Sequence, residues 1–305
     1  MKRTFLIFSL ISCLFLSAQD TLMPVVFLDD VVISVKNNGF NIEDFLRYVK
    51  NDTTFYMGFK HMRYYSHNYE SELNIFNKNG EVIGSLKKLG THYSNSKHAW
   101  IVNDSIYDKG KIFKRNGKYK YYTPEAFDEV FFPKDTIDVS LNMSKEKNEK
   151  ESQNMRDAKT VGFSIGTDDV EQSKSGISKK LSIFDISMQQ YYNYTISDTI
   201  FNEKECYVFV VKVKQNLNNR DREKTLIRKI VSYFDKENFN IIYRHYKFVY
   251  NHLLIDLDMD VVVHMNYING KHIPTFIHYK GFWDAIFFKV ERADFKLKNT
   301  NYLVD

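Results

Sequence analysis

Alternation of apolar and polar residues is the dominant pattern of this chain after its first 65 residues or so. It is purest over residues 253–265, where apolar side chains alternate with Asp256, Asp258, Asp260 and His264. A period of two places successive side chains on opposite sides of a strand. Strands are expected over part of 25–35, on both sides of Asn79-Gly80, and at 91–94, 99–107, 111–115, 118–122, 190–200, 205–214, 225–234, 241–250, 253–266, 271–280 and 286–298.

The Asn269-Gly270 pair predicts a tight hairpin turn, because both residue types accept the positive φ angles of such turns. A two-residue turn there pairs Ile268 with Lys271. Counting back along both strands, His264 then faces Thr275, and Asp260 faces Tyr279.

A helical period appears near the N-terminus and once more in the middle of the chain. Apolar residues at 42, 45, 46 and 49 form one stripe of a helix that Asn41 caps. The polar break at 51–53 starts a second helical segment through Phe55, Phe59 and Met62. Thr123-Pro124-Glu125 predicts a short helix that Pro133 ends.

Residues 141–180 interrupt these patterns, since they carry few large apolar side chains and cannot bury enough surface to offset their ordering entropy. We interpret them as a polar linker or long loop between an N-terminal α+β region (19–140) and a C-terminal antiparallel β region (181–305). The predicted fold class is α+β, mostly an antiparallel β meander forming a curved sheet or half-barrel, with N-terminal helices.

The first 18 residues have the layout of a secretory signal peptide. Lys2 and Arg3 precede an apolar run over 4–16 and the small pair Ser17-Ala18, so cleavage is expected between Ala18 and Gln19. In an alternative interpretation, Cys13 is lipidated as part of a lipoprotein box. Either one predicts export to the periplasm, to the outer membrane or to the medium, and no later segment is long and apolar enough for a transmembrane helix.

Charge and cysteine content narrow the classes of partner. The formal charge of +5 becomes +3 once Lys2 and Arg3 are removed, because residues 1–18 contain no acid. A balance so close to neutral predicts neither nucleic acid nor strong membrane-surface binding. Cleavage leaves Cys206 as the only cysteine, so an intrachain disulfide is excluded. Cys206 is most simply interpreted as a small buried side chain.

The Asp256–Asp260 cluster is the strongest candidate for chemistry. A calcium loop needs Gly and Glu where the chain has Val261 and Tyr267, so that interpretation fails. The carboxylates then lie on a solvent-exposed strand face or line a ligand site together with His264. Trp283, in a dense aromatic stretch with Phe282, Phe287 and Phe288, belongs to the core or to the rim of an apolar groove. The predicted ligand-lining residues are Asp256, Asp258, Asp260, His264 and Trp283.

No pattern for catalysis, metal binding or a cofactor emerges from the sequence. The nine histidines have no zinc-ligand spacing, and the chain has no phosphate loop or nucleophile elbow. Bases and aromatic residues interleave over 111–122, as in binders of single-stranded nucleic acid. We interpret these lysines instead as a guard against edge-to-edge aggregation of strands.

Three C-terminal motifs resemble sequence motifs of the lipoprotein carriers and lipoprotein-sorting proteins of Gram-negative outer membranes. They are Ser232–Lys236 followed by 240–242, Tyr267–Thr275, and Arg292–Lys296. That resemblance implies a half-barrel covered by helices, with an apolar ligand surface. Residues 28–34 with the helix at 40–49 are similar to a segment of uncharacterised exported envelope proteins.

Three hypotheses follow. The leading one is a non-enzymatic envelope protein that binds an apolar or lipidated ligand, such as a lipid or lipoprotein, in a curved β-sheet. The second is a structural or adaptor component that docks an outer-membrane or cell-surface assembly through an exposed strand edge. The third is a hydrolase that uses Asp256, Asp258, Asp260 and His264.

Overall fold

The computed structural model describes residues 31–34, 42–52, 54–95, 97–110, 112–139, 183–252, 255–285 and 290–304. The predicted signal peptide with Cys13 and the Ala18–Gln19 cleavage site, and the predicted linker at 141–180, lie outside these residues.

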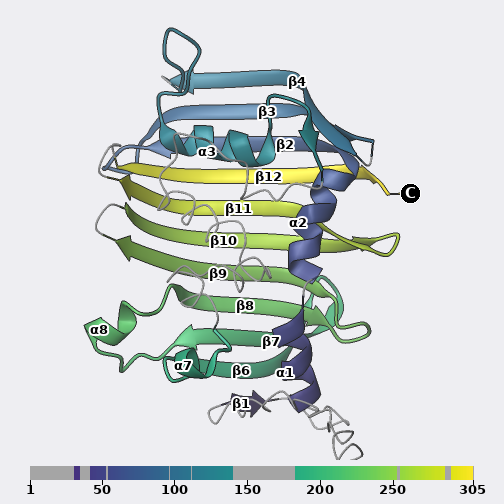
Figure 1. Cartoon of the computed structure of the whole chain (residues 1–305), viewed down its shortest axis with the longest axis vertical. Coiled ribbons are helices and arrows are strands. Elements are labelled where there is room, and N and C mark those ends of the chain that lie inside the picture. Colours follow the sequence, from purple (N-terminus) through teal and green to yellow (C-terminus); the bar gives the residue numbers. More distant parts are fainter. Residues whose placement is uncertain are drawn as a thin grey trace, which may run out of the picture.

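One large curved sheet contains every described strand (Figure 1). The strand order is β1-β6-β7-β8-β9-β10-β11-β12-β2-β3-β4-β5, so the sheet has two edges and does not close. Strands β2 to β12 pair in antiparallel fashion, and β1 joins β6 in parallel. The bounds are β1 Val31–Ser34, β2 Ser66–Phe76, β3 Val82–Ser94, β4 His98–Gly110, β5 Ile137–Asp138, β6 Tyr192–Phe201, β7 Lys204–Val213, β8 Ile227–Asp235, β9 Ile241–His252, β10 Ile255–Ile268, β11 Lys271–Ala285 and β12 Glu291–Leu303. The predicted α+β class with a curved antiparallel sheet is confirmed.

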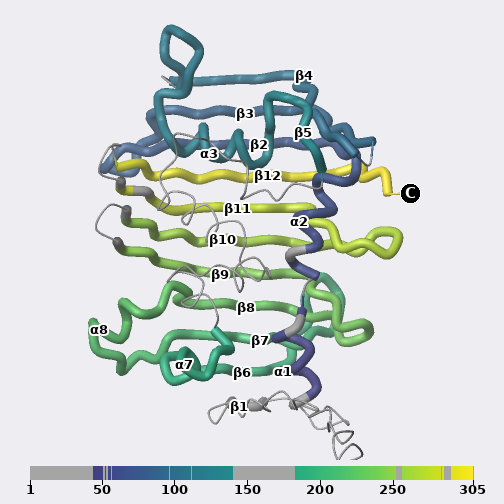
Figure 2. Tube along the Cα trace, viewed as in Figure 1, coloured from purple at the N-terminus to yellow at the C-terminus, as the bar shows by residue number. Residues whose placement is uncertain are grey.

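The longer helices lie on one face of this sheet (Figure 2). Helices α1 (Ile42–Asn51) and α2 (Thr54–Tyr64) run across the strands one after the other, and α3 (Tyr122–Phe131) packs near β12. Two short helices, α7 (Ile186–Gln189) and α8 (Asn219–Arg222), flank the β6–β8 end. Among the described helices, none combines the length and the apolar character needed to cross a bilayer.

Strand β12 joins the two regions that the sequence separates. It pairs with β11 on one side and with β2 on the other, where Phe295 lies opposite Leu73 and Leu297 opposite Ser71. Strands from both regions therefore form a single continuous sheet.

Side-chain alternation gives the sheet two unlike faces. We call the helix-bearing side the covered face. Its buried apolar residues are Tyr192, Tyr194, Ile196, Phe209, Val211, Val213, Ile230, Phe234, Tyr246, Phe248, Tyr250, Leu257, Met259, Val261, Val263, Met265, Ile277, Tyr279, Ala293, Phe295, Leu297, Tyr69, Leu73, Ile75 and Leu86. The other side, the open face, carries charged cross-strand pairs such as Lys87–Glu70 and Lys247–Asp258.

The predicted register of the Asn269-Gly270 hairpin is correct only close to the turn. Ile268 pairs with Lys271, but a bulge beyond Met265 shifts the register by one residue. His264 therefore faces Phe276 instead of Thr275, and Asp260 faces Lys280 instead of Tyr279. A bulge inserts one unpaired residue, and a count from the turn cannot anticipate it.

The prediction of two strands at 111–115 and 118–122 is wrong. The described part of this segment, from Ile112 to Tyr121, is a small hairpin with a single bridge between Phe113 and Tyr119. Its turn contains Gly117 at φ 76°, and the Lys114 N–H donates to the Lys118 carbonyl oxygen at 2.8 Å. Ile112 and Tyr119 turn inward and are buried, which ends the alternation after a few residues.

Candidate functional site: the covered face and its helices

The predicted Asp row lies on the open face of β10. Asp258 forms an ion pair with Lys247 of β9 at 3.3 Å. The Oδ1 atom of Asp260 lies 2.9 Å from Nε2 of His245, which is also on β9. Asp256 is exposed. Two of the three carboxylates are thus matched by a neighbouring base, which makes a row of like charges tolerable in a strand.

His264 does not join these carboxylates. Its ring lies among Tyr243 and Phe276, with ring centroids 5.2 and 5.4 Å away, and burial lowers its pKa. The base beside Asp260 is His245 instead. Within the described ranges, no group of three or more His, Cys, Asp or Glu side chains is arranged to hold a metal ion.

Trp283 is placed by its backbone on the other side of the sheet. It pairs with Leu257 on β10 and with Glu291 on β12, so its register position belongs to the covered face. Its side chain lies outside the described part of the structure. The five predicted ligand-lining residues therefore fall on two faces, and their role in binding remains a prediction.

The covered face is an apolar surface that continues across the strands from β6 to β3. In β10, Leu257, Met259, Val261 and Val263 are at most 3% exposed. Their neighbours in the register include Phe248 and Tyr246 on β9 and Tyr279 and Ile277 on β11. A side chain of this kind gains about 1.5–3 kcal/mol on full burial, so this face supplies the main driving force for folding.

Helix α1 reaches this face mainly through Phe45. Its ring makes edge contacts with Phe209 and Phe234, at centroid distances of 6.2 and 5.4 Å. The Tyr48 hydroxyl donates to the carbonyl oxygen of Phe239 at 3.0 Å. Burial and the charge of Asp52 raise the pKa of Tyr48 to about 12, so this hydroxyl keeps its proton at neutral pH.

A buried polar group marks the joint between α1 and α2. The Oδ1 atom of Asp52 accepts from the backbone N–H of Thr54 at 2.9 Å, which satisfies a donor in the first turn of α2. The other oxygen of Asp52 lies 4.0 Å from the guanidinium of Arg244, a buried residue of β9. Arg244 also donates to the Ser232 hydroxyl at 3.1 Å and stacks on the Phe55 ring at 4.3 Å. The joint thus rests on a long ion pair and a cation–π contact.

Helix α3 is attached by a more closely bonded group. The Lys88 ammonium lies 2.7 and 2.6 Å from the two carboxylate oxygens of Asp128, and both side chains are nearly inaccessible to solvent. The Tyr119 hydroxyl also donates to this carboxylate. Lys88 belongs to β3, Asp128 to α3 and Tyr119 to the small hairpin, so one buried cluster joins three elements.

Glu291 of β12 holds the N-terminus of α3. Its carboxylate accepts from the backbone N–H groups of Tyr122 and Thr123 at 2.7 and 2.8 Å and from the Thr123 hydroxyl at 2.7 Å. The residue before the helix, Tyr121, provides no side-chain cap. A carboxylate from another strand thus satisfies the first donors and complements the positive end of the helix.

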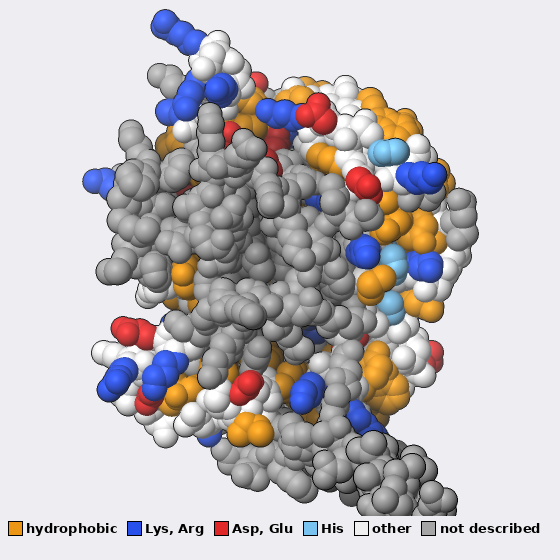
Figure 3. All heavy atoms as spheres, viewed as in Figure 1, with side chains coloured by type: hydrophobic (Ala, Val, Ile, Leu, Met, Phe, Trp, Pro, Cys, Tyr) orange, Lys and Arg blue, Asp and Glu red, His pale blue; other side chains and the backbone are white. Residues whose placement is uncertain are grey.

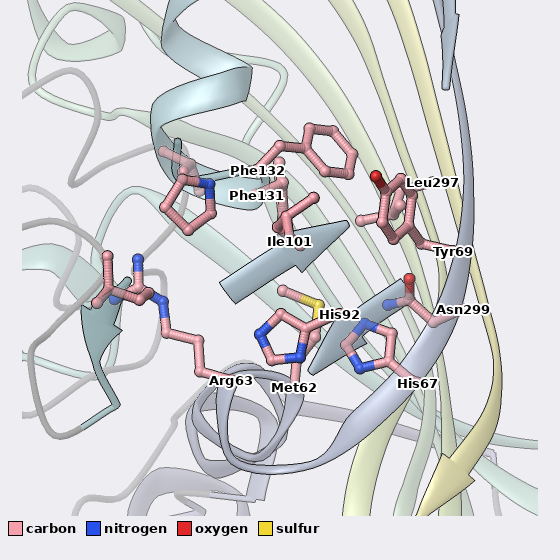
Figure 4. Close-up of a pocket in the computed structure, with 13 residues that line it drawn as sticks. Met62, Arg63, His67, Tyr69, His92, Ile101, Phe131, Phe132, Leu297 and Asn299 are labelled. Carbon is pink, nitrogen blue, oxygen red and sulfur yellow. The ribbon is translucent and has the colours of Figure 1, made fainter. Parts of the chain in front are cut away.

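A small pocket lies where the end of α2 meets β2, β3 and β12 (Figure 4). It holds about 20 Å³, room for one water molecule. The His67 and His92 rings stack beside it with centroids 4.7 Å apart, and Nδ1 of His67 lies 2.8 Å from the Tyr65 carbonyl oxygen. Burial, with the neighbouring His92, lowers the pKa of His67 to about 3, and burial lowers that of His92 to about 4, so both rings are neutral at pH 7.

The residues that tie the helices to the sheet were not singled out from the sequence. Lys88 and Arg244 both occupy positions where the alternation calls for an inward apolar side chain, next to Leu86 on β3 and Tyr246 on β9. A lone charge at an inward position is the signal that could have identified them. Cys206, in contrast, is buried as its apolar surroundings predict.

No family model and no curated protein matches this sequence. Among solved structures, the chain is similar to a DUF1329 family protein from Desulfovibrio piger, at 12% identity and a TM-score of 0.28, over 84% of this chain and 92% of that chain. It is also similar to an outer membrane lipoprotein-sorting protein domain from Vibrio parahaemolyticus, at 11% identity and a TM-score of 0.26, over 80% and 88% of the two chains.

A third likeness, to lipovitellin, has 8% identity and a TM-score of 0.26 and covers 78% of this chain but 25% of that chain. The lipoprotein-sorting family that the C-terminal motifs resemble is therefore among the structural neighbours. With TM-scores of 0.26 to 0.28, these likenesses support no conclusion about the ligand or activity of this chain.

Proposed function

We propose that this protein is a non-enzymatic binder of an apolar or lipidated ligand in a bacterial cell envelope, and that the ligand lies against the covered face of the sheet. The observation that carries the proposal is the largely apolar surface that continues across an unclosed sheet, seen most clearly in Leu257, Met259, Val261 and Val263. Ligand sites for apolar molecules are lined in this way, with few polar groups.

An acyl chain needs far more room than the described pocket beside His92 provides, since that pocket holds about one water molecule. Since the apolar side chains of the covered face are themselves buried, binding there requires a covering element to move. Helix α2 is the best candidate among the described elements. It packs on β11 and on Met265 through apolar contacts, and its polar contacts with the sheet include the long Asp52–Arg244 pair and the contact of His61 with the His272 carbonyl oxygen at 2.8 Å.

The first test is direct binding. The purified mature protein is examined by native mass spectrometry for co-purifying lipid and is then titrated with palmitate, phosphatidylethanolamine and a triacylated lipopeptide. We expect one ligand per chain for at least one of these probes. A chain that carries no lipid and binds none of the three would contradict the proposal.

The second test fixes α2 on the sheet. A Cβ atom at Gly58 would lie 2.1 Å from the terminal methyl carbon of Met265, so the two residues are adjacent, and a Gly58→Cys/Met265→Cys variant places thiols on α2 and β10 whose oxidation to a disulfide is checked by mass spectrometry. We expect the oxidised variant to lose uptake of the probe that binds the parent, and reduction to restore it. The single substitutions Gly58→Cys and Met265→Cys, which cannot form this bond, are the matched controls. Equal uptake by the oxidised and reduced forms would place the ligand elsewhere.

A further inference from the structure

Within the described part of the chain, most of the outer edge of strand β4 has no partner strand. It spans thirteen residues, and β3 pairs with it from Ala99 to Gly110. On its other side, β5 pairs only with His98 and Ala99. Among the described residues, no strand pairs with the outer edge of β4 from Trp100 to Gly110. Unpaired backbone N–H and C=O groups in such a row are a template for another strand.

Three large apolar side chains of β4 are exposed, beside the exposed acids Asp104 and Asp108. Val102 is 44% exposed, Ile106 50% and Tyr107 64%. Ile106 is opposite Lys88 and Tyr107 is opposite Lys87, so the apolar residues are offered on both faces of the strand. Large exposed apolar side chains along an unpaired strand edge are consistent with an interaction surface.

A strongly basic hairpin stands at the C-terminal end of β4. It carries exposed Lys114, Arg115, Lys118 and Lys120, and Lys109 is exposed at the strand end. No ion pair involves any of these five side chains within the described residues, and the described part of 112–120 contains no acid. Figure 3 shows Lys and Arg side chains protruding beyond this end of β4.

We propose that β4 binds an extended acidic segment of another protein, which adds to the sheet as an antiparallel strand. Backbone hydrogen bonds along 100–110 would supply affinity, and Val102, Ile106 and Tyr107 would pack on apolar side chains of the segment. The basic hairpin selects carboxylates at one end. Because an antiparallel strand starts where β4 ends, these carboxylates belong to the N-terminal end of the segment.

A second copy of this chain is a poorer occupant. Symmetric antiparallel pairing of two β4 strands would bring the basic hairpin of each copy to the other end of its partner, where Lys97 is exposed. The bulge at Asp104 also interrupts the strand and its symmetry. Exposed Asp138, which pairs with His98, offsets Lys97 at that end, so the bulge argues against self-association and the acid-free hairpin favours an acidic strand.

The test uses the mature protein and a short synthetic peptide of alternating valine and threonine with an N-terminal run of glutamates. The control peptide carries lysines in place of the glutamates. Hydrogen exchange is measured amide by amide with and without peptide. We expect the acidic peptide to slow exchange along 100–110 and to leave the amides of β8 and β9 unchanged. No protection of β4 at saturating acidic peptide, or equal protection by the lysine peptide, would overturn the proposal.

Two charge-reversed variants distinguish the contribution of the hairpin to peptide binding from the effect of the overall charge of the protein. Lys114→Glu/Arg115→Glu/Lys118→Glu should weaken peptide binding by about tenfold or more, and added salt should weaken binding to the parent. The matched control, Lys212→Glu/Lys280→Glu/Lys298→Glu, changes three exposed lysines elsewhere by the same charge and should bind within about twofold of the parent. An equal loss of peptide affinity in both variants would overturn the proposal that the hairpin recognises the acidic segment. Sedimentation of the parent alone should give a monomer, and a dimer lost on mutation of Ile106 to lysine would overturn the choice of occupant.

Discussion

Helices α3 and α2 cover the same apolar face but are held to it in different ways. Helix α3 is tied by buried charge at two points, with Lys88 bonded to both oxygens of Asp128 and Glu291 bonded to the first turn. Helix α2 is held by apolar contacts and by the bond of His61 to the His272 carbonyl oxygen at 2.8 Å, and the buried ion pair at its start spans 4.0 Å between Asp52 and Arg244. Close hydrogen-bonded charges fix one geometry, whereas apolar contacts tolerate sliding. We therefore expect the α3 end of the covered face to be rigid and the α2 end to be movable.

The largest effect is expected from breaking the α3 cluster. Lys88→Met leaves the Asp128 carboxylate buried without its cation, so the free energy of unfolding should fall by about 3–5 kcal/mol. Urea denaturation measures this change. The double variant Lys88→Met/Asp128→Leu removes both charges and should recover most of the loss. A single variant as stable as the parent would show that Asp128 does not depend on Lys88.

The next largest effect concerns the cap of α3. Glu291→Gln keeps the shape of the side chain but replaces the carboxylate that accepts hydrogen bonds from Tyr122 and Thr123 with a neutral amide. The free energy of unfolding should therefore fall by about 1.5–3 kcal/mol. The neighbouring Arg292, which is exposed, supplies the control Arg292→Gln, expected to change stability by less than about 0.5 kcal/mol. Thermal or urea unfolding distinguishes the two, and equal effects would argue against Glu291 as the cap.

A smaller effect is expected from the looser tie of α2. Arg244→Met removes the cation near Asp52, but that carboxylate keeps its bonds to Thr54, so the loss should be about 1–3 kcal/mol and below that of Lys88→Met. Native-state hydrogen exchange sharpens the comparison further. Amides of α2 should exchange faster than those of α3 in the parent, and Arg244→Met should widen the difference. Slower exchange in α2 than in α3 would reverse the assignment.

The smallest effect is a pH dependence at the end of α2. His67 and His92 have folded pKa values of about 3 and about 4, below the ordinary 6.5, so the unfolded chain binds protons first as the pH falls. Their contribution to stability is complete above pH 6.5 and is lost between 6.5 and about 4. At about pH 5.5 the loss should be on the order of 1 kcal/mol per histidine. Melting temperatures across this range should depend less on pH in His92→Phe, and an unchanged slope would contradict the assignment.

The sheet could be predicted because its signal is local. Alternation in 253–265 and the Asn-Gly turns depend on residues near one another in the chain, and the strands of the second half lie close to their expected ranges. The predicted register of β10 with β11 is wrong beyond the bulge at Thr275, because a single inserted residue leaves no mark on the alternation. The prediction of two strands at 111–115 and 118–122 failed because the side chains of Ile112 and Tyr119 turn toward α3 and the core.

The candidate site was less accessible to sequence reasoning. Asp256, Asp258, Asp260 and His264 attract notice because they are close in sequence, yet they occupy the open face, where bases from β9 match two of them. The ties of the covered face join residues far apart in the chain, such as Lys88 with Asp128 and Asp52 with Arg244. Only the pairing of distant strands brings such groups together, and no local pattern encodes it.

The place of β12 between β11 and β2 has a consequence for how the molecule is assembled. The β2–β4 segment cannot dock against the rest of the sheet until β12 arrives, since Phe295 and Leu297 supply its neighbours Leu73 and Ser71. Pairings so distant in sequence close a long loop and slow the search for the native state. Refolding should therefore pass through a stage in which β6–β11 are protected while β2–β4 still exchange, a delay during which a nascent or translocating chain would expose an unshielded β-sheet edge.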